Sequence, residues 1–248
     1  MISYVAGRFP AFEIGPVVLG QSYRNPALLA KMAATLQTLC GGRLIMGIGA
    51  GWKEDEYHAY GYPFPHAGVR IEQLEDTLEI LRRMWTEPGK VTYRGRHYQV
   101  VEAYCEPKPD PVPPIMVGGG GHKTTRLAAR YGDWWNIPDA NYTHYRERLA
   151  VLRAHCEDLG RDPATLRLTW FGRLAVGRTE VEALALGAPQ WNQSNAFVGA
   201  PQQVIEEMGR FVELGVDYFM VEVLGLPDPD IVGMVLEDVL PQVRALRP

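Results

Sequence analysis

Residues 21–65 read QSYRNPALLAKMAATLQTLCGGRLIMGIGAGWKEDEYHAYGYPFP, and this stretch decides the fold. Asn25-Pro26 supplies a helix N-cap followed by a first-turn proline. Residues 27–39 consist mainly of good helix formers, and Gly41-Gly42 ends that helix. Residues 44–48 (LIMGI) are apolar throughout and predict a buried strand. The stretch therefore predicts a helix that packs against a strand, which is the repeating unit of an α/β protein.

The same alternation of apolar runs and amphipathic stretches continues on both sides. Strand and helix alternate six times, and this pattern predicts a parallel sheet. The near-continuous apolar character of the strands fits burial on both faces, as in a barrel or a doubly wound sheet. The predicted strands are residues 14–19, 44–48, 115–117, 133–137, 166–176 and 218–223. The predicted helices are residues 27–39, 70–85, 123–131, 142–159, 179–186, 201–214 and 229–246. A hairpin is expected from residues 91–93 and 98–101.

Composition limits the possible classes of protein. The chain has 248 residues, 46% of them hydrophobic and 22% charged, which suits a globular protein of one large domain or two small ones. The net charge of −4 argues against a nucleic-acid partner, because phosphate binding needs a basic face. No apolar run approaches the length of a membrane span, and residues 1–10 lack the apolar core of a signal peptide. Three widely spaced cysteines, Cys40, Cys105 and Cys156, are expected to be buried or half-buried thiols, rather than nucleophiles, in a cytoplasmic protein.

Glycine-rich turns follow several predicted strands. In a parallel barrel, such turns lie at the C-terminal ends of the strands, where function concentrates. Residues 118–121 are four consecutive glycines, followed by His122, Lys123 and Thr124 at the start of a helix. Free N–H groups at a helix start attract an anion, and Lys123 and Thr124 add a cation and a hydroxyl donor. The sequence therefore favours a phosphate site here over a merely flexible turn.

The turn at residues 47–51 invites comparison with a dinucleotide fingerprint and does not match it. Gly47 and Gly49 would require a third glycine at position 52, which is Trp52. Trp52 itself has two interpretations, which the sequence leaves open. It either stacks on a planar ring or belongs to the core.

Three separated motifs together resemble a known family. Besides residues 21–65, they are residues 106–136 (EPKPDPVPPIMVGGGGHKTTRLAARYGDWWN) and residues 197–221 (FVGAPQQVIEEMGRFVELGVDYFMV). In this order they are similar to the luciferase-like monooxygenase superfamily, and most closely to its F420-dependent oxidoreductases. The similarity extends from about Ile14 to the C-terminus.

The resemblance implies a TIM-like (β/α)8 barrel and a cofactor, either coenzyme F420 or FMN, at the C-terminal ends of its strands. It implies a non-prolyl cis peptide at Val17-Val18. The cofactor ring would lie beside Gly20, and a small organic molecule would be the substrate. The remaining cofactor contacts that it implies are Ala50, Gly51, Asp55, Gly120, Gly121, Lys123 and Thr124.

The chain also departs from the family pattern. The first two barrel strands are expected before Ile14, so the barrel is expected to be incomplete. We expect one domain over residues 1–248, with an atypical segment at residues 1–13, and a homodimer in which the partner covers the open sheet edge. No catalytic residue can be assigned, because the catalytic histidine or acid of many relatives lies in the part expected before Ile14, and Trp52 stands where some relatives have a glutamate. Five side chains near the mouth of the site have two interpretations, a catalytic role or a place on a solvated helix and loop. They are Glu54, Glu56, His58, Tyr62 and His66.

Three functions remain open on this basis. The first is an oxidoreductase that transfers hydride with F420, or performs monooxygenation with FMN. The second is a truncated, catalytically impaired barrel that binds cofactor weakly or folds only as an oligomer. The third is a non-catalytic partner of an intact homologue. Substrate contacts are expected from the loops at residues 138–143 and 191–196, which the sequence does not interpret further.

Overall fold

The computed structural model describes residues 1–187 and 195–246, and it divides into two compact units. The first unit comprises residues 1–135 and 155–166, and the second comprises residues 136–154 and 167–248. Strand β6 (Trp134–Pro138) and helix α6 (Tyr142–Asp158) each contribute residues to both units.

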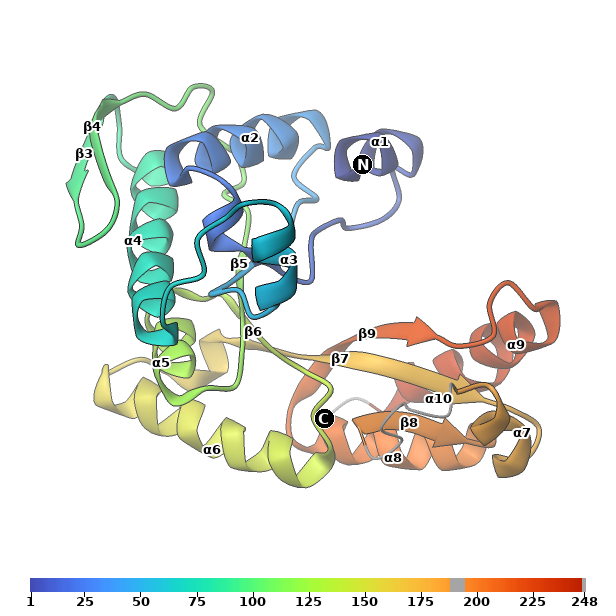
Figure 1. Ribbon diagram of the computed structural model, residues 1–248. Helices are drawn as coiled ribbons and strands as arrows, with labels where there is room; N and C mark the ends of the chain where they lie inside the picture. Colours follow the sequence, from blue (N-terminus) through green and yellow to red (C-terminus); the bar gives the residue numbers. More distant parts are fainter. Residues whose placement is uncertain (188–194, 247–248) are drawn as a thin grey trace. The chain divides into compact units, whose positions relative to one another are not determined.

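A parallel sheet forms the centre of the first unit (Figure 1). Its order is β1 (Leu19–Gly20), β2 (Met46–Gly49) and β5 (Ile115–Gly118). The strand expected at residues 14–19 is shorter than predicted, because only β1 and an isolated bridge between Ile14 and Leu44 form. Pro16 lies between them and has no N–H to donate to a neighbouring strand.

Helices α2 (Pro26–Leu39) and α4 (Ala67–Thr86) pack together beside this sheet. The Asn25 side chain caps α2 by accepting from two backbone N–H groups, as the sequence predicts. The buried face of α4 consists of side chains three and four residues apart, including Leu74, Leu78, Leu81 and Trp85. The Trp85 indole donates to the Ala30 carbonyl over 2.9 Å and ties α4 to α2. The other helices of this unit are α1 (Ile2–Arg8), η1 (Gln21–Tyr23), α3 (Glu54–Ala59), α5 (His122–Tyr131) and η2 (Pro163–Thr165).

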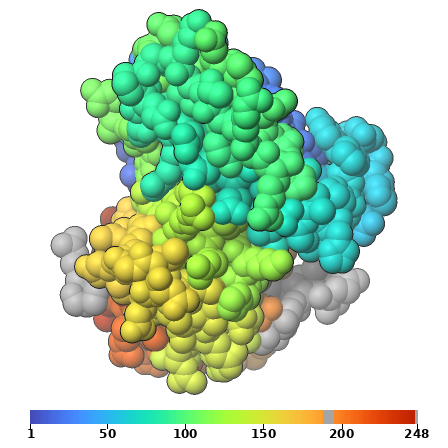
Figure 2. Space-filling model, turned by 90° about the vertical axis from the view of Figure 1, so that its left-hand side faces the viewer, coloured from blue at the N-terminus to red at the C-terminus, as the bar shows by residue number. Residues whose placement is uncertain are grey.

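The expected hairpin is confirmed as β3 (Val91–Arg94) paired with β4 (Gln99–Ala103). Its turn is held by Asp76 of α4, which is 4% exposed. The Asp76 carboxylate accepts from three consecutive backbone N–H groups, those of residues 96, 97 and 98, and from the Tyr93 hydroxyl. Figure 2 shows the hairpin (green) beside α4 (blue-green), covering the outer surface of this unit on the side facing the viewer.

The second unit is built on β7 (Arg167–Val176), which pairs in parallel with β8 (Ala196–Gly199) and with β9 (Val216–Val223). Buried aromatic rings form its core. The rings of Trp170 and Phe197 lie 4.2 Å apart, and both contact Phe211 of α8 (Pro201–Glu213). Helix α7 (Glu180–Ala185) begins after Thr179, whose side chain caps it by accepting from the Glu182 N–H.

The second unit differs from the sequence-based expectations in three places. The single helix expected at residues 229–246 is three segments: α9 (Pro229–Gly233), a π-helix at Met234–Val239 and α10 (Leu240–Ala245). Pro241 lacks the N–H that a continuous α-helix needs, and a π turn accommodates the missing bond. Ala196, expected in a substrate loop, begins β8; residues 191–194 of that loop lie outside the described residues. The loop expected at residues 138–143 is short, because α6 begins at Tyr142.

The N-terminal segment, for which the sequence predicted no structure, contains helix α1. Arg43 fixes it from outside, because its guanidinium donates to the carbonyls of Ala6, Phe9 and Phe12. Outside the antiparallel β3/β4 hairpin, the paired strands in both units are parallel, so the α/β class with a parallel sheet is confirmed. No helix in residues 1–187 or 195–246 is long and apolar enough to cross a membrane.

Candidate functional site

The ends of three neighbouring strands form the candidate site, all within the first unit. In the sheet register Gly20 lies opposite Gly49, and Gly49 lies opposite Gly118. The strands are parallel, so the turns that follow these glycines leave the sheet at one edge. This edge brings together Gly20, the turn at residues 50–51 and the turn at residues 119–121, as the sequence predicted.

The peptide bond between Val17 and Val18 is cis, which confirms the expectation. The Val18 side chain explains two of the glycines. A Cβ on Gly49 would lie 3.0 Å from Val18 Cγ2, and a Cβ on Gly118 would lie 2.8 Å from the same atom. Gly49 and Gly118 are therefore needed by the chain's own packing, and their lack of a side chain is not evidence of a ligand.

Helix α5 begins directly after the glycine run, and within the described residues no side chain caps its first turn. Gly121 is its N-cap and provides no side-chain acceptor for the first-turn N–H groups. Gly121 and Lys123 are exposed, while Thr124 is 7% exposed and lies against Gly119. Gly119 has a φ of +132°, a conformation that favours glycine. The residues present therefore suit an anion, because N–H groups without a side-chain cap, a lysine and a threonine occupy the start of one helix.

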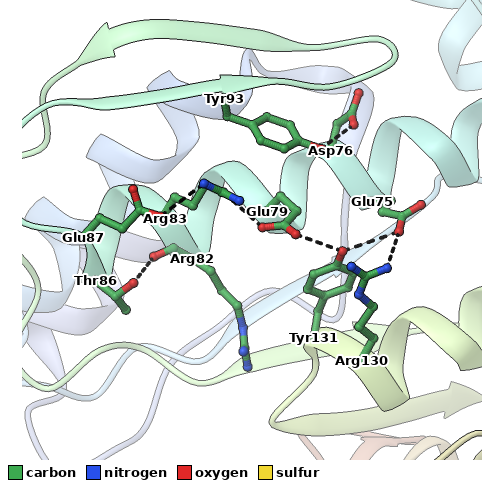
Figure 3. Close-up of polar contacts among 10 residues, drawn as sticks. All are labelled: Glu75, Asp76, Glu79, Arg82, Arg83, Thr86, Glu87, Tyr93, Arg130 and Tyr131. Atoms are coloured by element: carbon green, nitrogen blue, oxygen red, sulfur yellow. Dashed lines mark hydrogen bonds and ion pairs between the residues drawn. The ribbon is translucent and has the colours of Figure 1, made fainter. Parts of the chain in front are cut away.

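The position of α5 is fixed at its other end by α4 (Figure 3). The Tyr131 hydroxyl lies 3.2 Å from Glu79 and 3.4 Å from Glu75, and Arg130 pairs with Glu75 at 3.2 Å. Burial raises the pKa of Tyr131, so its hydroxyl keeps its proton and acts as a donor to these carboxylates. These contacts hold the C-terminal end of α5 against α4 and so fix the position of the helix whose first turn forms the site.

Tyr57 of α3 lies beneath the turns at Gly20 and Gly51. Its side chain is 1% exposed, and its hydroxyl donates to Ser22 Oγ over 3.2 Å. A Cβ on Gly51 would overlap the Tyr57 hydroxyl, and a Cβ on Gly20 would lie 3.2 Å from it. The rings of Tyr23, Tyr62 and Phe64 pack around Tyr57. Sequence reasoning missed Tyr57, because nothing in the pattern indicates that it reaches back to these glycines.

Gln21 was also missed, although it is fully buried beside the same turn. Its amide nitrogen donates to Ser22 Oγ over 2.7 Å and to Gln73 over 3.0 Å, and its oxygen accepts from Tyr98 over 3.2 Å. Ser22 Oγ thus accepts from both Gln21 and Tyr57, so its own proton is left to donate elsewhere. A buried glutamine after a strand carries no sequence signal that would have identified it.

The remaining candidates, apart from Ala50, are exposed. Trp52 is 81% exposed, so its interpretation as a core residue is wrong. Asp55 is exposed in the first turn of α3, and Ala50 is half-buried. His58 lies 3.9 Å from Glu54, and both side chains are mostly exposed.

Glu56 accepts from Tyr23 over 3.1 Å. Burial raises the pKa of Tyr23 to about 12, and the bond to Glu56 acts in the same direction. Tyr23 is therefore a hydrogen-bond donor at neutral pH. Tyr62 lies over the Tyr23 backbone, and His66 precedes α4 without capping it by its side chain. These contacts do not identify a catalytic base.

The cysteines are confirmed as buried thiols: Cys40, Cys105 and Cys156 are free and buried. Among the described residues, no group of three His, Cys, Asp or Glu side chains is placed to hold a metal ion.

Comparisons with known proteins identify the class that this fold and site define. The sequence model of the luciferase-like monooxygenase family matches residues 1–197. An F420-dependent glucose-6-phosphate dehydrogenase of Amycolatopsis mediterranei is 24% identical over 275 aligned residues, covering 98% of this chain and 82% of that protein. The enzyme of the same name from Kineococcus radiotolerans is 35% identical over 186 residues, 74% of this chain and 55% of its own length.

A solved structure has the same fold. An F420-dependent secondary alcohol dehydrogenase, in complex with an F420-acetone adduct, superposes with a TM-score of 0.81 at 21% identity. The match covers 92% of this chain and 78% of that one. The fold is thus an α/β fold of the TIM-barrel type found in this family.

The chain is a cofactor-dependent oxidoreductase. It belongs to the luciferase-like monooxygenase family. Of the interpretations that the sequence left open, the comparisons favour the enzyme.

Proposed function

We propose that this chain transfers hydride between coenzyme F420 and a small organic substrate, with the cofactor at the sheet edge formed by Gly20, Gly49 and Gly118. The observation that carries the proposal is the uncapped start of α5 beside the glycine run, because it suits the phosphate that F420 and FMN both contain. The named relatives that use F420 support F420 over FMN.

Each site residue has a proposed role toward the cofactor. Gly120, Gly121, Lys123 and Thr124 would hold the phosphate through backbone N–H groups, the ammonium and the hydroxyl. Gly20, Ala50 and Gly51 would lie along the ring, and Asp55 would provide a polar contact. F420 supplies the hydride acceptor or donor, while the protein binds, orients and excludes water. Tyr57 and Gln21 would keep the turn at residues 20–22 in place.

The second candidate is monooxygenation with FMN, which the family description favours. An assay separates the two. The purified chain is incubated with oxidised F420 and a panel of secondary alcohols and sugar phosphates, and loss of the cofactor's visible absorbance is followed. In parallel, oxygen uptake is measured with reduced FMN and the same panel. Turnover of F420 supports hydride transfer, oxygen uptake coupled to product supports the second candidate, and neither signal in a folded chain contradicts both.

We further propose that the chain forms a homodimer and works in the reducing cytoplasm. The three buried, unpaired thiols support the second point. Light scattering coupled to size exclusion measures the first: a mass near twice the 27.7 kDa of the chain is expected, and a monomer at micromolar concentration contradicts it.

A further inference from the structure

One hydrogen bond in the first unit bears directly on the glycine run. The indole Nε1 of Trp135, on β6, donates to the Gly119 carbonyl over 3.3 Å. The Trp135 side chain is fully buried, so this carbonyl points into the protein. The bond therefore fixes the direction of the peptide between Gly119 and Gly120.

The direction of that peptide determines the direction in which the Gly120 N–H points. In a trans peptide the C=O of one residue and the N–H of the next point in opposite directions. Since the Gly119 carbonyl faces the buried Trp135, the Gly120 N–H faces away from it. The φ of +132° at Gly119 shows that this orientation needs glycine at the turn.

The carbonyls of Gly121 and His122 also accept hydrogen bonds from the protein. The Gly121 carbonyl accepts from the N–H and the hydroxyl of Thr125, at 2.8 and 3.0 Å. The His122 carbonyl lies 3.2 Å from Nε2 of His155, a side chain of α6 that is 5% exposed. By the same peptide geometry, the N–H groups of His122 and Lys123 are directed oppositely to these carbonyls.

We infer that Trp135 is a positioning residue for the cofactor phosphate, because it turns the Gly120 N–H toward the group that the start of α5 binds. The inference rests on the proposed function. Trp135 adds the Gly120 donor to those that the helix start itself provides, and His155 contacts the first turn of α5 at the His122 carbonyl. Trp135 would act through the peptide between Gly119 and Gly120 and not by binding the phosphate itself.

The test compares the binding of a cofactor that carries a phosphate with the binding of the same ring system without the phosphate. Dissociation constants are measured for FMN against riboflavin, and for F420 against its deazaflavin ring with the ribityl chain alone. Trp135→Phe removes the indole N–H and keeps an aromatic ring. Trp85→Phe is the matched control, because Trp85 is equally buried in the same unit and donates to the Ala30 carbonyl.

Trp135→Phe is expected to raise the Kd of the phosphate-bearing cofactor by about tenfold, the effect of weakening one charge-assisted hydrogen bond. The Kd of the phosphate-free ring is expected to stay within about twofold. Trp85→Phe should leave the ratio of the two constants unchanged. A structural role alone would move both constants together in Trp135→Phe, and that result would overturn the inference.

A measurement on the unmodified chain decides the matter if Trp135→Phe does not fold. Inorganic phosphate is titrated into the isotope-labelled protein, and the Gly120 amide and Trp135 indole resonances are followed. Shifts in both that saturate together support the inference. An unmoved Gly120 amide in a chain that binds FMN or F420 overturns it while the proposed function stands; a wild-type chain that binds neither cofactor contradicts the proposed function itself.

Discussion

Tyr57 determines what can stand at Gly51. A side chain at Gly51 would overlap the Tyr57 hydroxyl, and the φ of +81° disfavours any other residue. We expect Gly51→Ala to destabilise the protein by about 1–3 kcal/mol. In the Tyr57→Phe background, where the hydroxyl is absent, the same change should cost less. Urea unfolding of both single variants and the double variant measures this coupling, and strictly additive effects would contradict the packing argument.

His155 should make stability depend on pH. Burial lowers its pKa from 6.5, and the neighbouring His122 acts in the same direction. The unfolded chain then binds a proton that the folded chain does not, so stability falls as the pH drops below about 6.5. The Tm of the wild type is expected to fall more steeply over this range than that of His155→Gln, which retains an amide donor. Parallel Tm curves for the two proteins would contradict this assignment.

The same residues show how far the sequence predicts the site. Glycines at strand ends, Lys123 and Thr124 were identifiable from position alone, and the structure brings them to one edge. The reasons for Gly49, Gly51 and Gly118 were not predictable, because Val18 and Tyr57 approach them from elsewhere in the chain. A run of glycines in a sequence shows that something approaches the backbone, but not whether it is a ligand or a side chain.

At the scale of elements, α5 carries the proposed phosphate site, and its buried face should matter more than its ion pair. The Arg130 and Glu75 side chains are 52% and 37% exposed, so their pair is expected to contribute less than about 1 kcal/mol. Leu127 is 6% exposed, and Leu127→Ala should cost about 2–5 kcal/mol. Chemical denaturation of Arg130→Ala and Leu127→Ala measures both. A larger loss for Arg130→Ala would show that the contacts in Figure 3 hold the helix.

Elements with local signals were predictable, and those held by distant contacts were not. Helices α2 and α4 agree with prediction to within about three residues, because caps and apolar spacing mark them. Helix α1 was missed, since it is fixed by Arg43 from outside. Strand β8 was missed because four residues paired along β7 leave little periodicity to detect.

At the scale of the whole molecule, the order of motifs was more informative than any single motif. The glycine run alone is compatible with several phosphate-binding folds. Its place after the third predicted strand, between two other motifs in a fixed order, indicated the family that the comparisons then showed. The substrate does not follow from this order, because loops rather than strands contact it.

Cofactor binding tests the central claim most directly. The purified chain is titrated separately with oxidised FMN and oxidised F420, and fluorescence quenching is followed. We predict that F420 binds with a Kd of about 1 μM or lower, and that Lys123→Ala weakens this binding by about tenfold. Circular dichroism that shows a folded chain, together with no binding of either cofactor, would contradict the account.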